Sequence, residues 1–163
     1  MKLIVSDANI LIFLSRLGLV DNFVSMDFEI HTTDFIINEY NKGGAGDKKL
    51  KRLEKYIRSD KIKVHQFLYD ELLSVYEQKR TLSIPDCSIF KLSSELQAVL
   101  LTGDKALKIY SEQNGITVHG IIWLIDEMHK HDIIDKVEYK EKLNELKGLS
   151  SRLPVEEIDR RLK

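Results

Sequence analysis

The feature that most constrains the fold is the stretch Lys2–Asn9, in which an apolar run ends at an acid. Short β-branched runs bounded by polar residues are typical of buried strands, so residues 2–6 are expected to form one. A second apolar run at residues 10–14 predicts a helix over 9–17. Asp7 therefore lies where a central strand ends and a helix begins, which in an open parallel sheet is the crevice where ligands bind.

Apolar and polar segments alternate in the same way along the rest of the chain. Further strands are predicted at 28–31, 62–64, 98–102 and 116–118. Helices are predicted at 19–25, 34–43, 48–59, 69–76, 83–96, 104–114, 121–130, 136–146 and 154–162. This repeated alternation indicates an α/β fold with a mainly parallel sheet. We assign residues 1–131 to this domain and residues 132–163 to a C-terminal helical extension packed on it.

The composition narrows the class of protein. A length of 163 residues fits one domain, and a hydrophobic content of 43% suffices for a core without disulfides. A single cysteine suits a reducing compartment, and neither a signal segment nor a membrane-spanning apolar run is present, so we expect a cytoplasmic protein. The net charge of −1 gives no overall attraction to polyanions, so contact with nucleic acid must come from local patches.

Four acids stand out by their positions. Asp7 and Asp104 directly follow predicted strands, while Glu39 and Asp86 lie on predicted helices at the spacing of inward-facing apolar residues. Carboxylates on an apolar face require a partner, and several that converge repel one another unless a cation joins them. Mg²⁺ and Mn²⁺ prefer such oxygen ligands. If the four acids meet, they form a metal cup suited to hydrolysis of a phosphodiester by a metal-activated water.

Each acid also has a purely structural interpretation. Asp7 and Asp104 are well placed to cap the helices that follow them. Asp86 lies in a first helical turn, where the helix dipole favours an acid, and Glu39 could lie just off the buried stripe in solvent. Taken one at a time, the acids leave both interpretations open.

The order of the acids and their neighbours resembles the PIN-domain nuclease family, in particular its compact prokaryotic members. The resemblance covers roughly residues 1–131. The matching blocks are Val5-Ser6-Asp7-Ala8-Asn9-Ile10-Leu11, Ile37-Asn38-Glu39-Tyr40, Pro85-Asp86-Cys87-Ser88 and Leu100-Leu101-Thr102-Gly103-Asp104-Lys105-Ala106-Leu107. It implies a three-layer α/β/α sandwich around a central, mainly parallel sheet of about five strands.

The resemblance also assigns roles to individual residues. Asp7, Glu39, Asp86 and Asp104 fall on the acidic metal-site positions of the family, and Asn9 and Thr102 fall on the small polar positions that support them. Similar proteins are usually Mg²⁺- or Mn²⁺-dependent ribonucleases, many are toxins held inactive by a cognate antitoxin, and many are homodimers. Two regions depart from the pattern, residues 43–59 and the segment His119-Gly120-Ile121-Ile122, where many relatives have Gly-Thr. The RNA substrate and the partner therefore stay open.

We hypothesise a division of labour among these residues. Asp7 is the central ligand, and Asp86 and Asp104 bind metal directly or through waters. Glu39 is either a further ligand or the group that orients the attacking water. Asn9 and Thr102 donate the hydrogen bonds that fix the carboxylates.

A basic helix face is a candidate for contact with the phosphates of RNA. It carries Lys48, Lys49, Lys51, Arg52 and Lys55. The alternative is an ordinary solvated helix face, because acids at positions 47 and 54 interrupt it.

Two other functions compete with the nuclease, and the histidines and Cys87 do not supply a third. The five histidines lack the spacing of a metal site, so we take them as structural, and Cys87 as a buried core residue. A receiver-type signalling module would carry more acids near its accepting strand than the single Asp7. A catalytically silent PIN-like scaffold that binds RNA or protein is the main alternative, because a fold does not determine a function.

Overall fold

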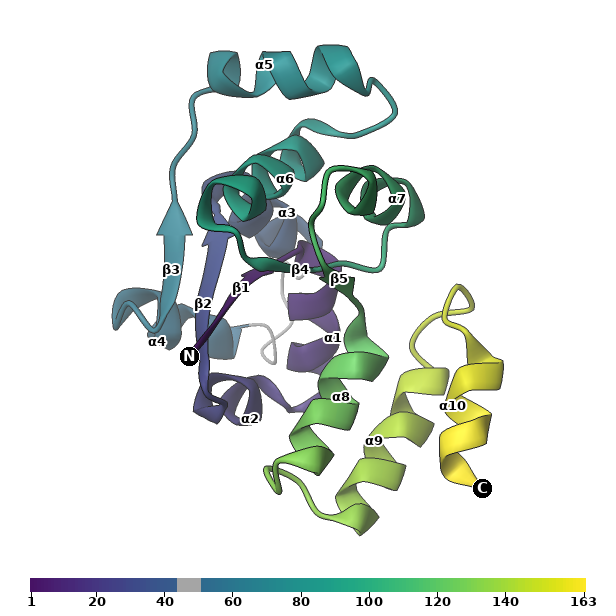
Figure 1. The fold of residues 1–163 in the computed structure, drawn as a ribbon. Coiled ribbons are helices and arrows are strands. Elements are labelled where there is room, and N and C mark those ends of the chain that lie inside the picture. The colour runs from purple at the N-terminus through teal and green to yellow at the C-terminus, as the bar shows by residue number, and fades with distance from the viewer. Residues whose placement is uncertain (44–50) are drawn as a thin grey trace.

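Five parallel strands form the centre of the protein, seen in a computed structural model that describes residues 1–43 and 51–163 (Figure 1). Their order across the sheet is β3-β2-β1-β4-β5, and every neighbouring pair is parallel. The strands are β1 Lys2–Ser6, β2 Phe28–Thr33, β3 Ile62–His65, β4 Val99–Leu101 and β5 Val118–His119.

Helices cover both faces of this sheet, with α1 and α6 on opposite sides of it (Figure 1). The helices are α1 Ala8–Leu17, α2 Val20–Ser25, α3 Asp34–Gly43, α4 Leu53–Arg58, α5 Tyr69–Gln78, α6 Ile84–Leu96, α7 Lys105–Gln113, α8 Ile121–Lys130, α9 Lys136–Lys147 and α10 Val155–Leu162. The predicted α/β/α architecture with a parallel sheet of five strands is confirmed.

The chain reverses its direction of travel across the sheet on either side of β1. From β1 it moves outward through β2 to β3, and it then returns to place β4 and β5 on the other side. Ser6 at the end of β1 pairs in register with Leu101 at the end of β4, so Asp7 and Thr102 leave the sheet side by side. This is the switch point at which open α/β sheets bind their ligands.

The apolar run that opens the chain is buried because β1 is the central strand. Ile4 and Val5 have no exposed surface, and neither do Leu100 and Leu101 of the neighbouring β4. Strands covered by helices on both faces read as continuous apolar runs rather than as alternating patterns. The two clearest strand signals in the sequence are therefore the two strands that border the switch point.

The C-terminal helices pack on the body of the domain rather than standing apart from it. α9 lies against both α8 and α1, and α10 lies against α9 (Figure 1). Leu143, Leu146 and Ile158 from these helices are fully buried in the same hydrophobic cluster as the sheet. Among the residues described, none of the helices is long and apolar enough to cross a membrane.

Small differences from the predicted elements have local causes. The last strand was expected at 116–118 but is Val118–His119. The backbone N–H of Ile116 instead donates to Ser111 at the end of α7, beyond Gly115 in the left-handed conformation (φ +80°). Of the helix expected over 48–59, residues 48–50 lie outside the described residues, residues 51–52 form a 3₁₀ turn, and α4 begins at Leu53.

We predict that Ile158→Ala lowers the free energy of unfolding by about 2–4 kcal/mol, since it removes a fully buried side chain from the shared core. Urea denaturation followed by circular dichroism should show one cooperative transition at a lower midpoint. The control is Val155→Ala on the same helix, whose side chain is 39% exposed and should change little. A separate early transition confined to the C-terminal helices would contradict a shared core.

Candidate active site

Asp7 lies at the end of β1 and connects three elements. Its backbone is extended (φ −76°, ψ 161°), and its Oδ1 accepts a 2.7 Å hydrogen bond from the N–H of Ala8, so it caps α1. Its Oδ2 accepts a 2.6 Å hydrogen bond from the hydroxyl of Thr102, just after β4. Asp7 is only 5% exposed. Helix capping therefore explains the position of Oδ1 only. Oδ2 is held by the hydroxyl that follows the neighbouring strand.

The charge of Asp7 is disfavoured where it lies. Burial is the main cause that raises its pKa from 3.8 to about 7, against the lowering effect of the Thr102 hydrogen bond. The negative charges of Asp86 and Glu39 raise it further. Three of the predicted acids therefore lie within electrostatic range of one another.

Asp86 lies in the first turn of α6, where it forms a capping box with Ser83. The N–H of Asp86 donates to Ser83 Oγ and the N–H of Ser83 donates to Asp86 Oδ2, both at 3.2 Å. Desolvation raises the pKa of Asp86, the bonds from Ser83 lower it, and the charge of Asp104 raises it. Asp86 therefore lies within electrostatic range of Asp104 as well as of the other acids.

A pair of buried hydroxyls positions this turn of α6, and sequence reasoning missed it. Thr33 Oγ1 at the end of β2 lies 2.7 Å from Ser88 Oγ, two residues beyond Asp86. Thr33 also accepts a hydrogen bond from the N–H of Ile36 at the start of α3. The sequence does show Ser88 in the matching block around Asp86. Nothing in the sequence indicates that Ser88 contacts the end of a strand 55 residues earlier.

Glu39 is exposed, so the expected inward face was wrong for this residue. α3 buries Ile36 and Tyr40, and Glu39 projects from the margin of that stripe. Desolvation is the main cause that raises the pKa of its carboxyl, the charge of Asp86 raises it too, and Lys42 lowers it. Glu39 therefore lies at the rim of the acidic cluster, close enough for the charge of the cluster to raise its pKa.

Asp104 follows β4 and caps α7, whose Leu107 N–H donates to its Oδ1 at 2.8 Å. Its own N–H donates to the Thr102 hydroxyl at 3.1 Å, and that hydroxyl donates onward to Asp7. Thr102 therefore joins the two acids on either side of the switch point. It fixes the position of one strand end relative to the other.

Asn9, in the first turn of α1, was expected to donate a hydrogen bond to the carboxylates, but its side chain makes none among the described residues. Its Oδ1 is buried and has no hydrogen-bond partner among the described residues. A Cβ at Gly103 would lie 2.9 Å from its Nδ2, so the amide packs directly under the loop that precedes Asp104. An orphaned buried oxygen is unfavourable unless a cation or a donor completes it.

The donor chemistry of this cluster fits Mg²⁺ or Mn²⁺, since it consists of carboxylate and amide oxygens. No group of three His, Cys, Asp or Glu side chains within residues 1–43 and 51–163 is arranged to hold a metal ion by itself. Mg²⁺ keeps several waters and is usually held by one or two carboxylates, so a closed cage of protein ligands is not required. The mutual repulsion of the acids and the orphaned Asn9 oxygen both favour a cation here.

The described part of the basic helix face lies away from the acids. Arg52 and Lys55 approach Asp21 of α2 at 3.8 and 3.5 Å. α2 precedes β2 and α4 precedes β3, so these cations lie near the edge where strands begin, whereas the acids lie where strands end. Lys48 and Lys49 of the same predicted face lie outside the described residues.

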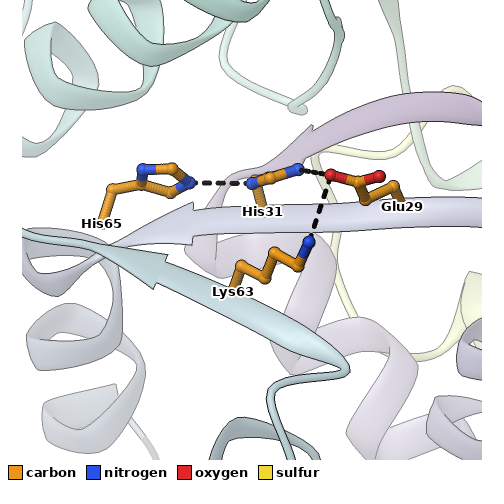
Figure 2. A network of polar contacts seen from close by, with 4 residues as sticks. All are labelled: Glu29, His31, Lys63 and His65. Atoms are coloured by element: carbon orange, nitrogen blue, oxygen red, sulfur yellow. Dashed lines mark hydrogen bonds and ion pairs between the residues drawn. The ribbon is translucent and has the colours of Figure 1, made fainter.

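Two of the histidines form a polar network across β2 and β3 (Figure 2). Buried His31 donates from Nε2 to Glu29 Oε1 at 2.9 Å, and its Nδ1 lies 2.8 Å from Nε2 of His65. Lys63 approaches the same oxygen of Glu29 at 3.3 Å. Both ring nitrogens of His31 are satisfied, which explains its burial and agrees with a structural role.

The chain belongs to the PIN-domain family, whose model matches residues 3–163, and members of this family are generally nucleases. The match continues through the C-terminal helices. Among proteins with curated descriptions, none matches the chain.

Solved structures share the fold. PAE2754 from Pyrobaculum aerophilum superimposes with a TM-score of 0.58 at 18% identity, covering 76% of this chain and 92% of that one. The PilT N-terminus domain protein SSO1118 from Sulfolobus solfataricus P2 gives 0.54 at 14% identity, covering 80% and 96%. A domain of a functionally unknown protein from Methanocaldococcus jannaschii DSM 2661 gives 0.50 at 20% identity, covering 74% and 91%. At these identities the likeness is one of fold.

We predict that Asp7→Asn stabilises the metal-free protein above neutral pH. The raised pKa means that the folded state binds more protons than the unfolded state between pH 3.8 and about 7, so stability falls as pH rises through that window. Removing the charge should raise the free energy of unfolding by on the order of 2 kcal/mol at pH 8.

Urea titrations in chelator at several pH values measure this effect, and the gain should vanish toward pH 4, near the unfolded-state pKa of 3.8. Asp135→Asn is the matched control, because Asp135 caps α9 through a 2.8 Å bond from the N–H of Glu138 but is exposed. Equal effects of the two substitutions would show that burial of the Asp7 charge is not the cause.

Proposed function

We propose that this chain is a Mg²⁺- or Mn²⁺-dependent ribonuclease that hydrolyses phosphodiester bonds in RNA. One observation carries the proposal. Asp7, Glu39, Asp86 and Asp104 come from four separate elements, yet their charges interact at the switch point of the sheet, around a nearly buried Asp7. Packing alone gives no reason to gather like charges there.

Asp7, Asp86 and Asp104 would hold the divalent ion directly or through its waters, with Glu39 at the rim. When bound, such an ion supplies an activated water and offsets the charge that develops on the scissile phosphate. The chain's own contribution is orientation: Ala8 and Thr102 fix the two oxygens of Asp7 in advance. Glu39 is accessible and has a raised pKa, so its carboxylate suits acceptance of a proton from the attacking water.

The silent scaffold is the alternative that the site must exclude. Asp7, Asp86 and Asp104 each cap a helix, so capping accounts for the presence of three acids. Capping does not account for the burial of Asp7 or for its proximity to two further acids, because an N-cap works as well at an exposed position such as Asp135. The metal-binding interpretation explains both features.

We predict that wild-type protein binds Mn²⁺ in calorimetric titrations and that Asp104→Asn weakens this binding at least about tenfold. Asp135→Asn is again the control, because both residues accept a 2.8 Å hydrogen bond from the N–H three residues on. The same variants should be compared for cleavage of a labelled single-stranded RNA, with EDTA and with DNA of the same sequence as comparisons.

Retention of metal binding and cleavage by Asp104→Asn and by Asp7→Asn would return the acids to helix caps and favour the scaffold. Preferential cleavage of DNA would show that the substrate is DNA rather than RNA, while the proposed metal-dependent hydrolysis would still hold. A toxin role, a cognate antitoxin and a homodimer stay predictions from the resemblance to the family.

A further inference from the structure

A cavity of about 350 Å³ adjoins the acidic cluster on its β4–β5 side. Thr102 and Asp104 form part of its wall, and Thr102 is the residue that bonds to Asp7. The opposite wall comes from Arg152–Pro154, between α9 and α10. Its volume lies within the range of small-molecule sites, so it is large enough for one nucleotide.

A column of stacked rings ends in this cavity. Phe28 and Trp123 are stacked with centroids 6.3 Å apart, and Trp123 and His119 are stacked at 4.0 Å with an interplanar angle of 5°. His119 and Trp123 both line the cavity, and Phe28 does not. The column therefore places two of its three rings, His119 and Trp123, in the cavity wall.

Burial is the main cause that lowers the pKa of His119. The charges of Lys2 and Lys108 also lower it, and Glu127 and Glu112 oppose them. Burial and the nearby lysines therefore favour the neutral form of the ring. A neutral imidazole stacks without repelling nearby cations.

Three cations in the wall have side chains without an ion pair or hydrogen bond inside the described protein: Lys105, Lys108 and Arg152. Arg161 lines the cavity too, but it is committed to Asp126, with its Nε 2.9 and 3.0 Å from the two carboxylate oxygens. This pair ties α10 to α8 and so holds the segment that carries Arg152. The unpaired cations are those available to a ligand.

We infer that this cavity binds a nucleotide of single-stranded RNA next to the bond to be cleaved. The base stacks on the ring of His119, and the phosphate lies among Lys105, Lys108 and Arg152. That the bound strand is RNA rests on the proposed function. That the cavity binds a base and a phosphate is inferred from the rings and cations in its walls. Stacking on aromatic rings combined with backbone cations is the usual means of holding single strands.

The test uses a built-in reporter, because Trp123 is the single tryptophan of the chain and lies in the wall. Titration of the 163-residue protein in EDTA with adenosine 5′-monophosphate, and with a short oligoadenylate, should change its fluorescence saturably. Inorganic phosphate should not reproduce the change. His119→Ala should weaken binding of the oligoadenylate about tenfold, and Lys108→Ala should weaken it in a salt-dependent way.

The controls separate stacking from general effects. His119→Phe keeps a ring and should retain binding, whereas His131→Ala and Lys61→Ala, both exposed and outside the cavity wall, should leave it unchanged. Calorimetry with the same ligands confirms affinities where the His119 substitution itself alters the fluorescence.

A flat fluorescence and calorimetric response to every nucleotide would overturn the inference, and so would equal weakening by His131→Ala. A response to phosphate alone would reduce the cavity to an anion site and overturn the base-stacking role. Because the measurement excludes metal, it is independent of cleavage. Nucleotide binding without metal-dependent cleavage would refute the proposed function alone, and cleavage without nucleotide binding would refute this inference alone.

Discussion

The structure depends on the hydrogen bond between Thr102 and the buried carboxylate of Asp7. Because β1 is the central strand, every side chain near its end is enclosed by helices, and a carboxylate there must be satisfied from within. The N–H of Ala8 satisfies one oxygen, and Thr102, from the neighbouring strand, satisfies the other. These two bonds fix the start of α1 against the end of β4. They therefore add side-chain contacts to the backbone pairing of β1 with β4 at the point where the candidate site lies.

The same bonds explain how a stable fold can tolerate four acids in one place. Asp86 and Asp104 also form helix caps, so their carboxylates contribute to local structure while remaining in range of Asp7. Only Asp7 is enclosed enough for its charge to be strongly disfavoured. The electrostatic cost of the cluster therefore falls mainly on Asp7. A bound cation would stabilise the charge of this residue the most. Groups whose charge is disfavoured in the folded state are common at functional sites, where stability is often lower than it could be.

The fold was predictable from the sequence because its signals are local. Continuous apolar runs marked β1 and β4, and acids immediately after them placed Asp7 and Asp104 at one edge of the sheet. What could not be predicted depends on residues far apart in the chain. The Thr33–Ser88 pair, the His31–His65 pair and the ring column of Phe28, Trp123 and His119 each require the folded arrangement. Glu39 was misplaced for a different reason: it lies at the margin of a helical stripe, where a small rotation decides between burial and exposure.

Apart from Asp104, the acidic cluster and the neighbouring cavity are built from different side chains. The proposed hydrolysis and the proposed selection of a substrate therefore depend mainly on different parts of the molecule. On the proposed function the acids would act on a phosphodiester, which is the same in every nucleic acid, so they would not by themselves distinguish one strand from another. Discrimination must come from groups that meet a base, and the neighbouring cavity is where rings and unpaired cations meet the acidic cluster. Part of its wall is Arg152–Pro154, held in place through the Arg161–Asp126 pair. A C-terminal segment that completes this wall can change without disturbing the caps that position the acids, so on the proposed function substrate preference would vary while the acidic cluster stays fixed.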